Sequence, residues 1–135
     1  MFLTVMVWGC DVSGEKKKIL LIDDDELQHK IADNMLSDEF EVFKAKSGND
    51  ALSYLYNGSF IPNLILLDIL MPEMDGWEVF NRIKALSLLK NVPIIFITAL
   101  NTTTEQNRAF EVGAADFIAK PYSREELTER IRKIL

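Results

Sequence analysis

The sequence has one cysteine, one histidine and no long apolar run, and each of these scarcities excludes a class of protein. A single cysteine, Cys10, cannot form an intrachain disulfide or a multi-cysteine metal site. We therefore expect the protein to be located in the reducing cytoplasm. No apolar stretch approaches the roughly 18 residues that a membrane helix needs. The net charge of −6 comes with no stripe of basic residues for a phosphate backbone. We therefore expect no direct contact with membrane or nucleic acid.

Residues 1–16 form an N-terminal extension, apolar over its first ten residues, whose role the sequence does not explain. The first ten residues, MFLTVMVWGC, lack the basic start of a secretory signal. We expect either an ordered extension that packs on the domain or on a neighbouring chain, or an upstream start of little consequence. Residues 17–135 have the length of one ordinary domain.

Short apolar runs alternate with helical patterns along this domain. A run of four consecutive apolar residues, LILL at 64–67, is typical of a strand buried on both faces, whereas strict alternation is typical of an edge strand. Five strands alternating with five helices predict an α/β fold, with a parallel sheet covered on both faces. The predicted strands are 18–22, 40–45, 64–67, 94–98 and 115–119.

Polar side chains follow the predicted strands at the point where each strand ends. Because parallel strands end at one edge of a sheet, where ligands bind in open α/β folds, we expect these side chains to meet. Three carboxylates so close together cannot all stay ionised without a cation. Oxygen ligands suit Mg²⁺, or Mn²⁺, whereas zinc would recruit histidine or cysteine. The strand-end residues are Asp23, Asp24, Asp68, Thr98 and Lys120.

This set of side chains predicts a centre for metal-assisted phosphoryl transfer. Asp68 is a carboxylate nucleophile of the kind that forms an aspartyl-phosphate. The metal and Lys120 would neutralise the transferred oxygens, and Thr98 would donate a hydrogen bond to one of them.

The sequence resembles a response-regulator receiver domain, the phospho-accepting partner of sensor histidine kinases, over residues 17–135. The segments that carry the resemblance are LLIDDDE, LLDILMPEMDG, IFITA and FIAKPY. The resemblance implies a flavodoxin-like, doubly wound (βα)5 sandwich of three layers, whose five-stranded parallel sheet has the order 2-1-3-4-5.

The resemblance also implies a role for each residue of the site. Asp68 would accept the phosphoryl group from a sensor histidine kinase or a histidine phosphotransfer protein. Asp24 would bind Mg²⁺ directly and Asp23 mainly through water, with the backbone carbonyl of Leu70 as a further ligand. Thr98 and Lys120 would hold phosphoryl oxygens.

Three further expectations concern the surroundings of this site. The Lys120–Pro121 peptide bond is expected to be cis, which a following proline makes plausible. Phe117 stands where the family has its aromatic switch residue, and it would move inward when Thr98 is drawn toward the phosphoryl group. Leu70 and Leu100 are apolar and would not orient a water, so we expect a long-lived phosphoryl group.

We expect no output domain in this chain, so phosphorylation would act through protein contacts. The resemblance implies a face made of the fourth helix, the fifth strand and the fifth helix, which would bind an unknown downstream protein or a second copy of the chain. This face would include 102–107, Phe117, Tyr122 and the exposed side of 124–133.

Three other functions stay open. A phosphorelay intermediate or phosphate sink would need only transfer into and out of Asp68. A flavodoxin-like nucleotide or flavin binder would need a phosphate cradle where this sequence has three aspartates. A hydrolase would need a second acid two residues after the nucleophile, where Leu70 stands, so we expect no turnover enzyme.

We expect two residues outside the site, a histidine and a tryptophan, to have structural roles only. His29 lies between polar neighbours in the first helix, so we expect it on the surface. Trp77 begins a helix and is interpreted as packing. We expect the apolar side of the first helix to consist of Leu27, Ile31, Met35 and Leu36.

Overall fold

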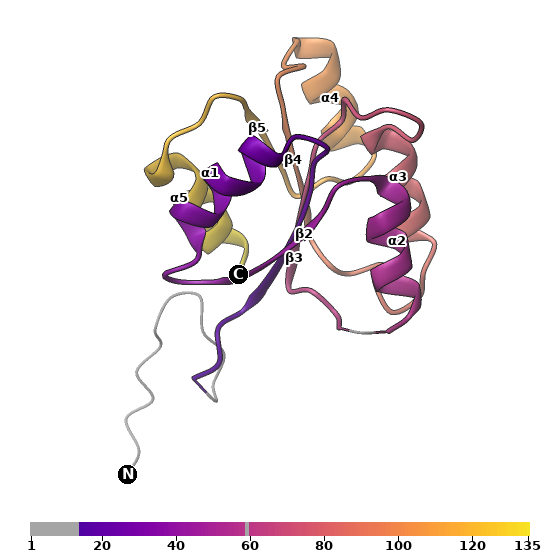
Figure 1. Cartoon of the computed structure of the whole chain (residues 1–135). Coiled ribbons are helices and arrows are strands. Elements are labelled where there is room, and N and C mark those ends of the chain that lie inside the picture. The colour runs from indigo at the N-terminus through magenta and orange to yellow at the C-terminus, as the bar shows by residue number, and fades with distance from the viewer. Residues whose placement is uncertain (1–13, 59) are drawn as a thin grey trace.

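The computed structural model describes residues 14–58 and 60–135, in which five strands alternate with five helices (Figure 1). All five predicted strands form. The strands are β1 (Lys18–Ile22), β2 (Glu41–Ala45), β3 (Leu64–Leu67), β4 (Ile94–Thr98) and β5 (Asp116–Ala119). The helices are α1 (Glu26–Leu36), α2 (Gly48–Tyr56), α3 (Gly76–Lys84), α4 (Thr103–Glu111) and α5 (Arg124–Ile134).

The strands form one parallel sheet in the order β2-β1-β3-β4-β5, which confirms the predicted flavodoxin-like fold. Helices α1 and α5 lie on one face of the sheet, and α2 and α3 lie on the other (Figure 1). Helix α4 contributes Ala109 to the core on the α2–α3 side. The central strand β3 is buried along its whole length, as its uninterrupted apolar run predicts.

Each helix begins after a side chain that caps its free backbone N–H groups. In every case an Asp, Ser or Thr oxygen accepts a hydrogen bond from an N–H two or three residues further on. A cap of this kind stabilises a helix by about 1 kcal/mol. These caps fix the residue at which each helix begins. The capping residues are Asp25, Ser47, Asp75, Thr102 and Ser123.

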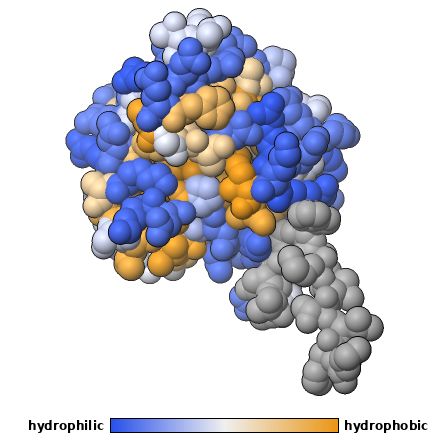
Figure 2. Space-filling model, turned by 180° about the vertical axis from the view of Figure 1, so that it is seen from behind, coloured by the Kyte–Doolittle hydropathy of each residue, from blue (hydrophilic) through white to orange (hydrophobic). Residues whose placement is uncertain are grey.

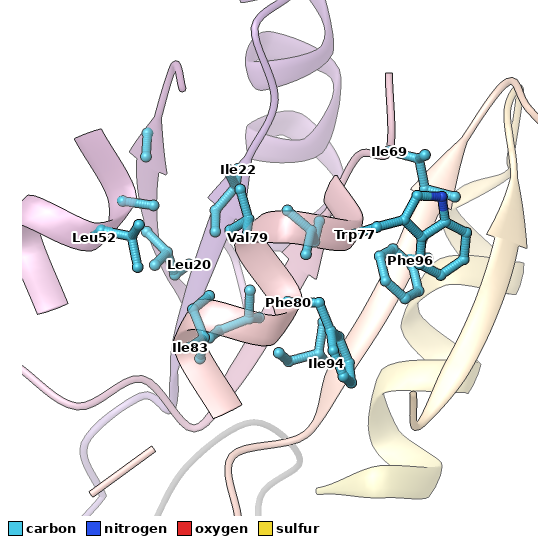
Figure 3. Close-up of a cluster of buried hydrophobic side chains, with 14 of the residues drawn as sticks. Leu20, Ile22, Leu52, Ile69, Trp77, Val79, Phe80, Ile83, Ile94 and Phe96 are labelled. Atoms are coloured by element: carbon cyan, nitrogen blue, oxygen red, sulfur yellow. The ribbon is translucent and has the colours of Figure 1, made fainter. Parts of the chain in front are cut away.

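The larger core fills the space between the sheet and helices α2, α3 and α4 (Figure 3). Phe96 of β4 belongs to this core, with its ring centroid 4.7 Å from that of Trp77 and 5.5 Å from that of Phe80. The packing role expected for Trp77 is confirmed, since its side chain is buried in this cluster. A second cluster lies between the other face of the sheet and helices α1 and α5.

The predicted apolar side of helix α1 is confirmed at its end, where Leu36 is buried and Met35 packs against the core, and is wrong at its start. His29, expected on the surface, is only 5% exposed, whereas Leu27, expected on the apolar side, is 60% exposed. The cap at Asp25 sets where α1 begins, and the residues that then face the sheet are His29, Ala32 and Leu36, at spacings of three and four.

For Tyr122, at which both packing and partner contact were open, the structure shows packing. It is partly buried against the cluster between the sheet and helices α1 and α5. Burial raises the pKa of its phenol above the ordinary value of 10.0.

Apolar surface is interspersed with hydrophilic side chains on the face seen in Figure 2. Among the exposed large apolar side chains of the described residues are Phe110 and Val112 near the end of α4. None of the helices within 14–58 and 60–135 combines the length and apolar character of a membrane span. The expectation for the N-terminal extension falls largely on residues 1–13, outside the described part of the chain.

Candidate functional site

Two buried aspartates follow the central strands side by side. The last residues of β1 and β3 are partners in the sheet register, Ile22 with Leu67, so Asp23 and Asp68 come next to each other. The Asp68 N–H donates to the carbonyl of Ile22 at 3.0 Å, and the Asp23 N–H donates to the carbonyl of Ala45 at 3.1 Å. The ladder therefore continues past the strand ends and fixes both backbones.

Lys120 brings a positive charge between these two carboxylates. Its Nζ donates to Asp23 Oδ2 at 2.7 Å and to Asp68 Oδ2 at 3.0 Å. The Lys120 backbone N–H donates to the carbonyl of Thr98 at 2.9 Å, which holds the lysine at the end of β5. The cation that balances Asp68 thus comes from a position 52 residues further along the chain.

A third carboxylate completes an acidic cluster at this edge. One carboxylate oxygen from each of Asp23, Asp24 and Asp68 lies within 4.8 Å of the others, and Asp24 is exposed. Three carboxylates against one ammonium leave an excess of negative charge, and an all-oxygen donor set fits Mg²⁺ or Mn²⁺. The metal role of these residues and of the Leu70 carbonyl stays a prediction.

The pocket shifts the pKa of two of its groups. Burial raises the pKa of Asp23 above the ordinary value of 3.8, although its bonds to Lys120 and to the Asp25 N–H oppose the rise. Burial alone would lower the pKa of Lys120, but its hydrogen bonds and attraction to Asp23 and Asp68 outweigh burial and raise it. The ammonium is shared by two carboxylates, so it keeps its charge while Asp23 still carries a burial penalty.

Thr98 and Phe117, the predicted switch residues, are both buried. The Leu100 N–H donates to Thr98 Oγ1 at 3.1 Å, so the hydroxyl is bonded to the loop that follows β4. Phe117 lies opposite Phe96 in the sheet register, with its ring inside the core. The Lys120–Pro121 peptide bond is cis.

Two residues that contact the site were not foreseen. His29 Nε2 lies 2.7 Å from the backbone carbonyl oxygen of Asp23, and because a carbonyl only accepts, Nε2 carries the proton and donates it. At Gly76 an added Cβ would lie 2.3 Å from the carbonyl oxygen of Asp68 and 2.7 Å from Ile69 Cα. The Asp75-Gly76 pair indicates a helix start in the sequence, but not that α3 packs on the backbone of Asp68.

A doubly wound parallel sheet with three acids, a threonine and a lysine at its carboxyl edge is the arrangement of receiver proteins in two-component signalling. The family model for the response regulator receiver domain matches residues 19–132. The chain belongs to this family of signalling domains, which favours the receiver interpretation over the flavin-binding and hydrolase alternatives.

Among curated proteins, the chain is 39% identical over 122 residues to the probable transcriptional regulator ycf27 of Porphyridium aerugineum, covering 90% of this chain and 49% of that protein. It is 40% identical over 119 residues to the transcriptional regulatory protein CrdR of Helicobacter pylori, covering 87% of this chain and 54% of that protein. The chain thus spans about half the length of these relatives.

Solved structures show the same fold. The chemotaxis protein CheY4 of Vibrio cholerae matches with a TM-score of 0.80 and 28% identity, over 88% of this chain and 98% of that one. A chain from the CheX-CheY-BeF3-Mg+2 complex of Borrelia burgdorferi matches with a TM-score of 0.86 and 27% identity, over 93% of this chain and 95% of that one.

Proposed function

We propose that this chain is a phospho-accepting receiver of a two-component system in the cytoplasm. Asp68 takes the phosphoryl group of a phosphohistidine on a sensor histidine kinase or a histidine phosphotransfer protein. The bond between phosphorus and the histidine nitrogen breaks, its electron pair stays on the imidazole, and a bond to a carboxylate oxygen of Asp68 forms. One observation carries the proposal: Asp68 Oδ2 lies 3.0 Å from Lys120 Nζ, beside two further carboxylates.

The residues around Asp68 fit the parts of such a transfer. Asp23, Asp24, Asp68 and the Leu70 carbonyl would hold Mg²⁺ or Mn²⁺, and the bound cation would neutralise charge on the transferred oxygens. The Leu70 N–H donates to Asp68 Oδ1 at 3.3 Å, which leaves Oδ2 beside Lys120. Lys120 then holds a phosphoryl oxygen by charge and hydrogen bonding.

The contacts of Thr98 indicate how the phosphoryl group alters the surface. Its hydroxyl accepts the Leu100 N–H, so moving Thr98 toward a phosphoryl oxygen loosens the loop before α4. Phe117, already inside the core, is then held inward. Phosphorylation and partner binding favour the same conformer, as thermodynamic linkage requires.

The output surface in this proposal is made of α4, β5 and α5. The exposed side chains of Phe110 and Val112 give α4 apolar contact area for a downstream protein, or for a second copy of the chain. A phosphate sink is the alternative in which this surface has no partner, and pull-down with wild type and Asp68→Asn, each treated with a phosphate mimic, separates the two.

The phospho-acceptor itself is tested with acetyl phosphate and Mg²⁺, followed by intact-mass spectrometry. The wild type is expected to gain one phosphoryl group, and Asp68→Asn none. Asp75→Asn is the matched control, because Asp75 caps α3 with a side-chain oxygen that asparagine keeps. Labelling of Asp68→Asn at the wild-type level would refute the assignment of Asp68.

A further inference from the structure

A groove lies beside the acidic pocket, between the loop from β3 to α3 and helix α4. Its volume is about 500 Å³, and its lining includes the buried side chains of Ile69, Met71 and Trp77. Leu70 lines it as well and is 53% exposed. The groove therefore offers apolar surface open to solvent.

Two charged residues of α4 face this groove without pairing with each other. Glu105 Oε2 is covered by protein and has no hydrogen-bond partner among residues 14–58 and 60–135. The Arg108 guanidinium, one helical turn further on, lies over the Trp77 ring at 4.2 Å from its centroid. A buried carboxylate oxygen without a donor is unfavourable. The Glu105 side chain is only partly buried, so a donor that enters the groove can bind its carboxylate once the side chain turns toward the groove.

The charges around the groove indicate which kind of chemical group would donate a hydrogen bond to Glu105. Asp75 also lines the groove, and the Asp68 pocket with its three carboxylates adjoins it. Arg108 is exposed and already stacked on Trp77, whereas the covered oxygen belongs to Glu105. A cationic donor complements this arrangement, and an anionic group does not.

We propose that the groove binds a segment of a partner protein that places an arginine or lysine on Glu105 and an apolar side chain against Leu70 and Leu100. An arginine fits best, because its planar guanidinium forms paired hydrogen bonds with a carboxylate. The partner segment also needs an apolar side chain beside its cation, because the groove is largely apolar. Without that side chain, Leu70 would stay exposed to water and its burial would not contribute to binding.

Two hydrogen bonds connect this groove to the phosphorylation site. The Leu70 N–H donates to Asp68 Oδ1 at 3.3 Å, and the Leu100 N–H donates to Thr98 Oγ1 at 3.1 Å. Both residues line the groove, so a change at Asp68 or Thr98 alters its shape. The affinity for the segment therefore depends on phosphorylation, and this dependence rests on the proposed function.

The test uses the whole chain and three peptides that differ at one position: acetyl-Leu-Arg-Leu-amide, acetyl-Leu-Gln-Leu-amide and acetyl-Leu-Glu-Leu-amide. Binding is followed by NMR of leucine and methionine methyl groups and of the Trp77 indole. The arginine peptide should give saturable shifts at Leu70, Met71 and Leu100, with the glutamine peptide weaker and the glutamate peptide weakest. Preference for the glutamate peptide would overturn the proposal.

Two matched variants locate the cation. Glu105→Gln should weaken the arginine peptide about tenfold, as expected when a charge-assisted hydrogen bond is lost. Glu111→Gln, on an exposed position of the same helix, should leave binding unchanged. Equal affinity of wild type and Glu105→Gln for the arginine peptide would refute the groove as its site.

The coupling to phosphorylation is tested separately. Beryllofluoride with Mg²⁺ should change the affinity of the arginine peptide for wild type and not for Asp68→Asn. An unchanged affinity in wild type would refute the coupling. Because the first titration uses no metal and no phosphate mimic, failure of the groove is distinguished from failure of Asp68 as phospho-acceptor.

Discussion

Replacing Lys120 by methionine should destabilise the protein at neutral pH, because two buried carboxylates would then face each other without a cation. The side chains of Asp23, Asp68 and Lys120 are 2%, 7% and 14% exposed. Removing one partner of a buried ion pair costs about 3–5 kcal/mol. Since one carboxylate here can take up a proton, we expect the lower end, about 3 kcal/mol at pH 7. For a domain of this size that is a fall of about 10 °C in Tm.

The loss should depend on pH in a definite direction. Burial raises the pKa of Asp23 in the wild type, and Lys120→Met removes the hydrogen bond and charge that oppose this rise, so the pKa of Asp23 rises further in the variant. The contribution of Asp23 to the stability of Lys120→Met should therefore be fully present below the ordinary carboxyl pKa of 3.8 and be lost as pH rises through the raised pKa. The difference from wild type should accordingly be smaller at pH 5 than at pH 7, and millimolar Mg²⁺ should reduce it at pH 7.

Urea denaturation in EDTA at both pH values, followed by circular dichroism, measures this effect. Lys46→Met is the control, because the ion pair of Lys46 with Glu26 is exposed and should contribute little. Adding Asp23→Asn to Lys120→Met should recover most of the lost stability. A Lys120→Met variant as stable as wild type at pH 7, or equally weakened at both pH values, would refute the reasoning.

Three further predictions follow from the same site. Because the raised pKa of Asp23 lets protons compete with the metal, the dissociation constant for Mg²⁺ should rise as pH falls from 7 to 5, as isothermal titration calorimetry can show; a constant value would contradict this. Gly76→Ala should cost about 2–3 kcal/mol in urea denaturation, because its Cβ would overlap the Asp68 backbone. Gly58→Ala, strained at φ 64° but in open space, should cost only about 1 kcal/mol. Leu70→Asn should shorten the lifetime of the phosphorylated form, because an amide can orient a water, and an unchanged half-life after removal of acetyl phosphate would argue against this role.

The sheet could be predicted because each strand carries its own signal. A strand buried on both faces must be apolar at every position, and LILL at 64–67 has no helical period to compete with that interpretation. Once the strands are known to be parallel, their carboxyl ends must share one edge. The meeting of Asp23, Asp68 and Lys120 follows from topology rather than from any local pattern.

What could not be predicted depends on the rotation of helices and on side-chain packing. His29 is polar among polar neighbours, and only the position of the cap at Asp25 turns it toward the sheet. In α4 the small Ala109 is buried while the larger Phe110 is exposed, so apolar character alone misleads there. The position of Arg108 over Trp77 depends on contacts between elements far apart in the sequence.

The contact of His29 with Asp23 has a mechanical consequence. The imidazole holds the main chain of the aspartate, whereas its carboxylate is bonded separately, to Lys120 and to the Asp25 N–H. Any displacement of α1 along its axis therefore also shifts the backbone of Asp23, whose carboxylate belongs to the pocket. A protein seated on that helix could thus adjust the electrostatics of the pocket without contacting any of its charged side chains.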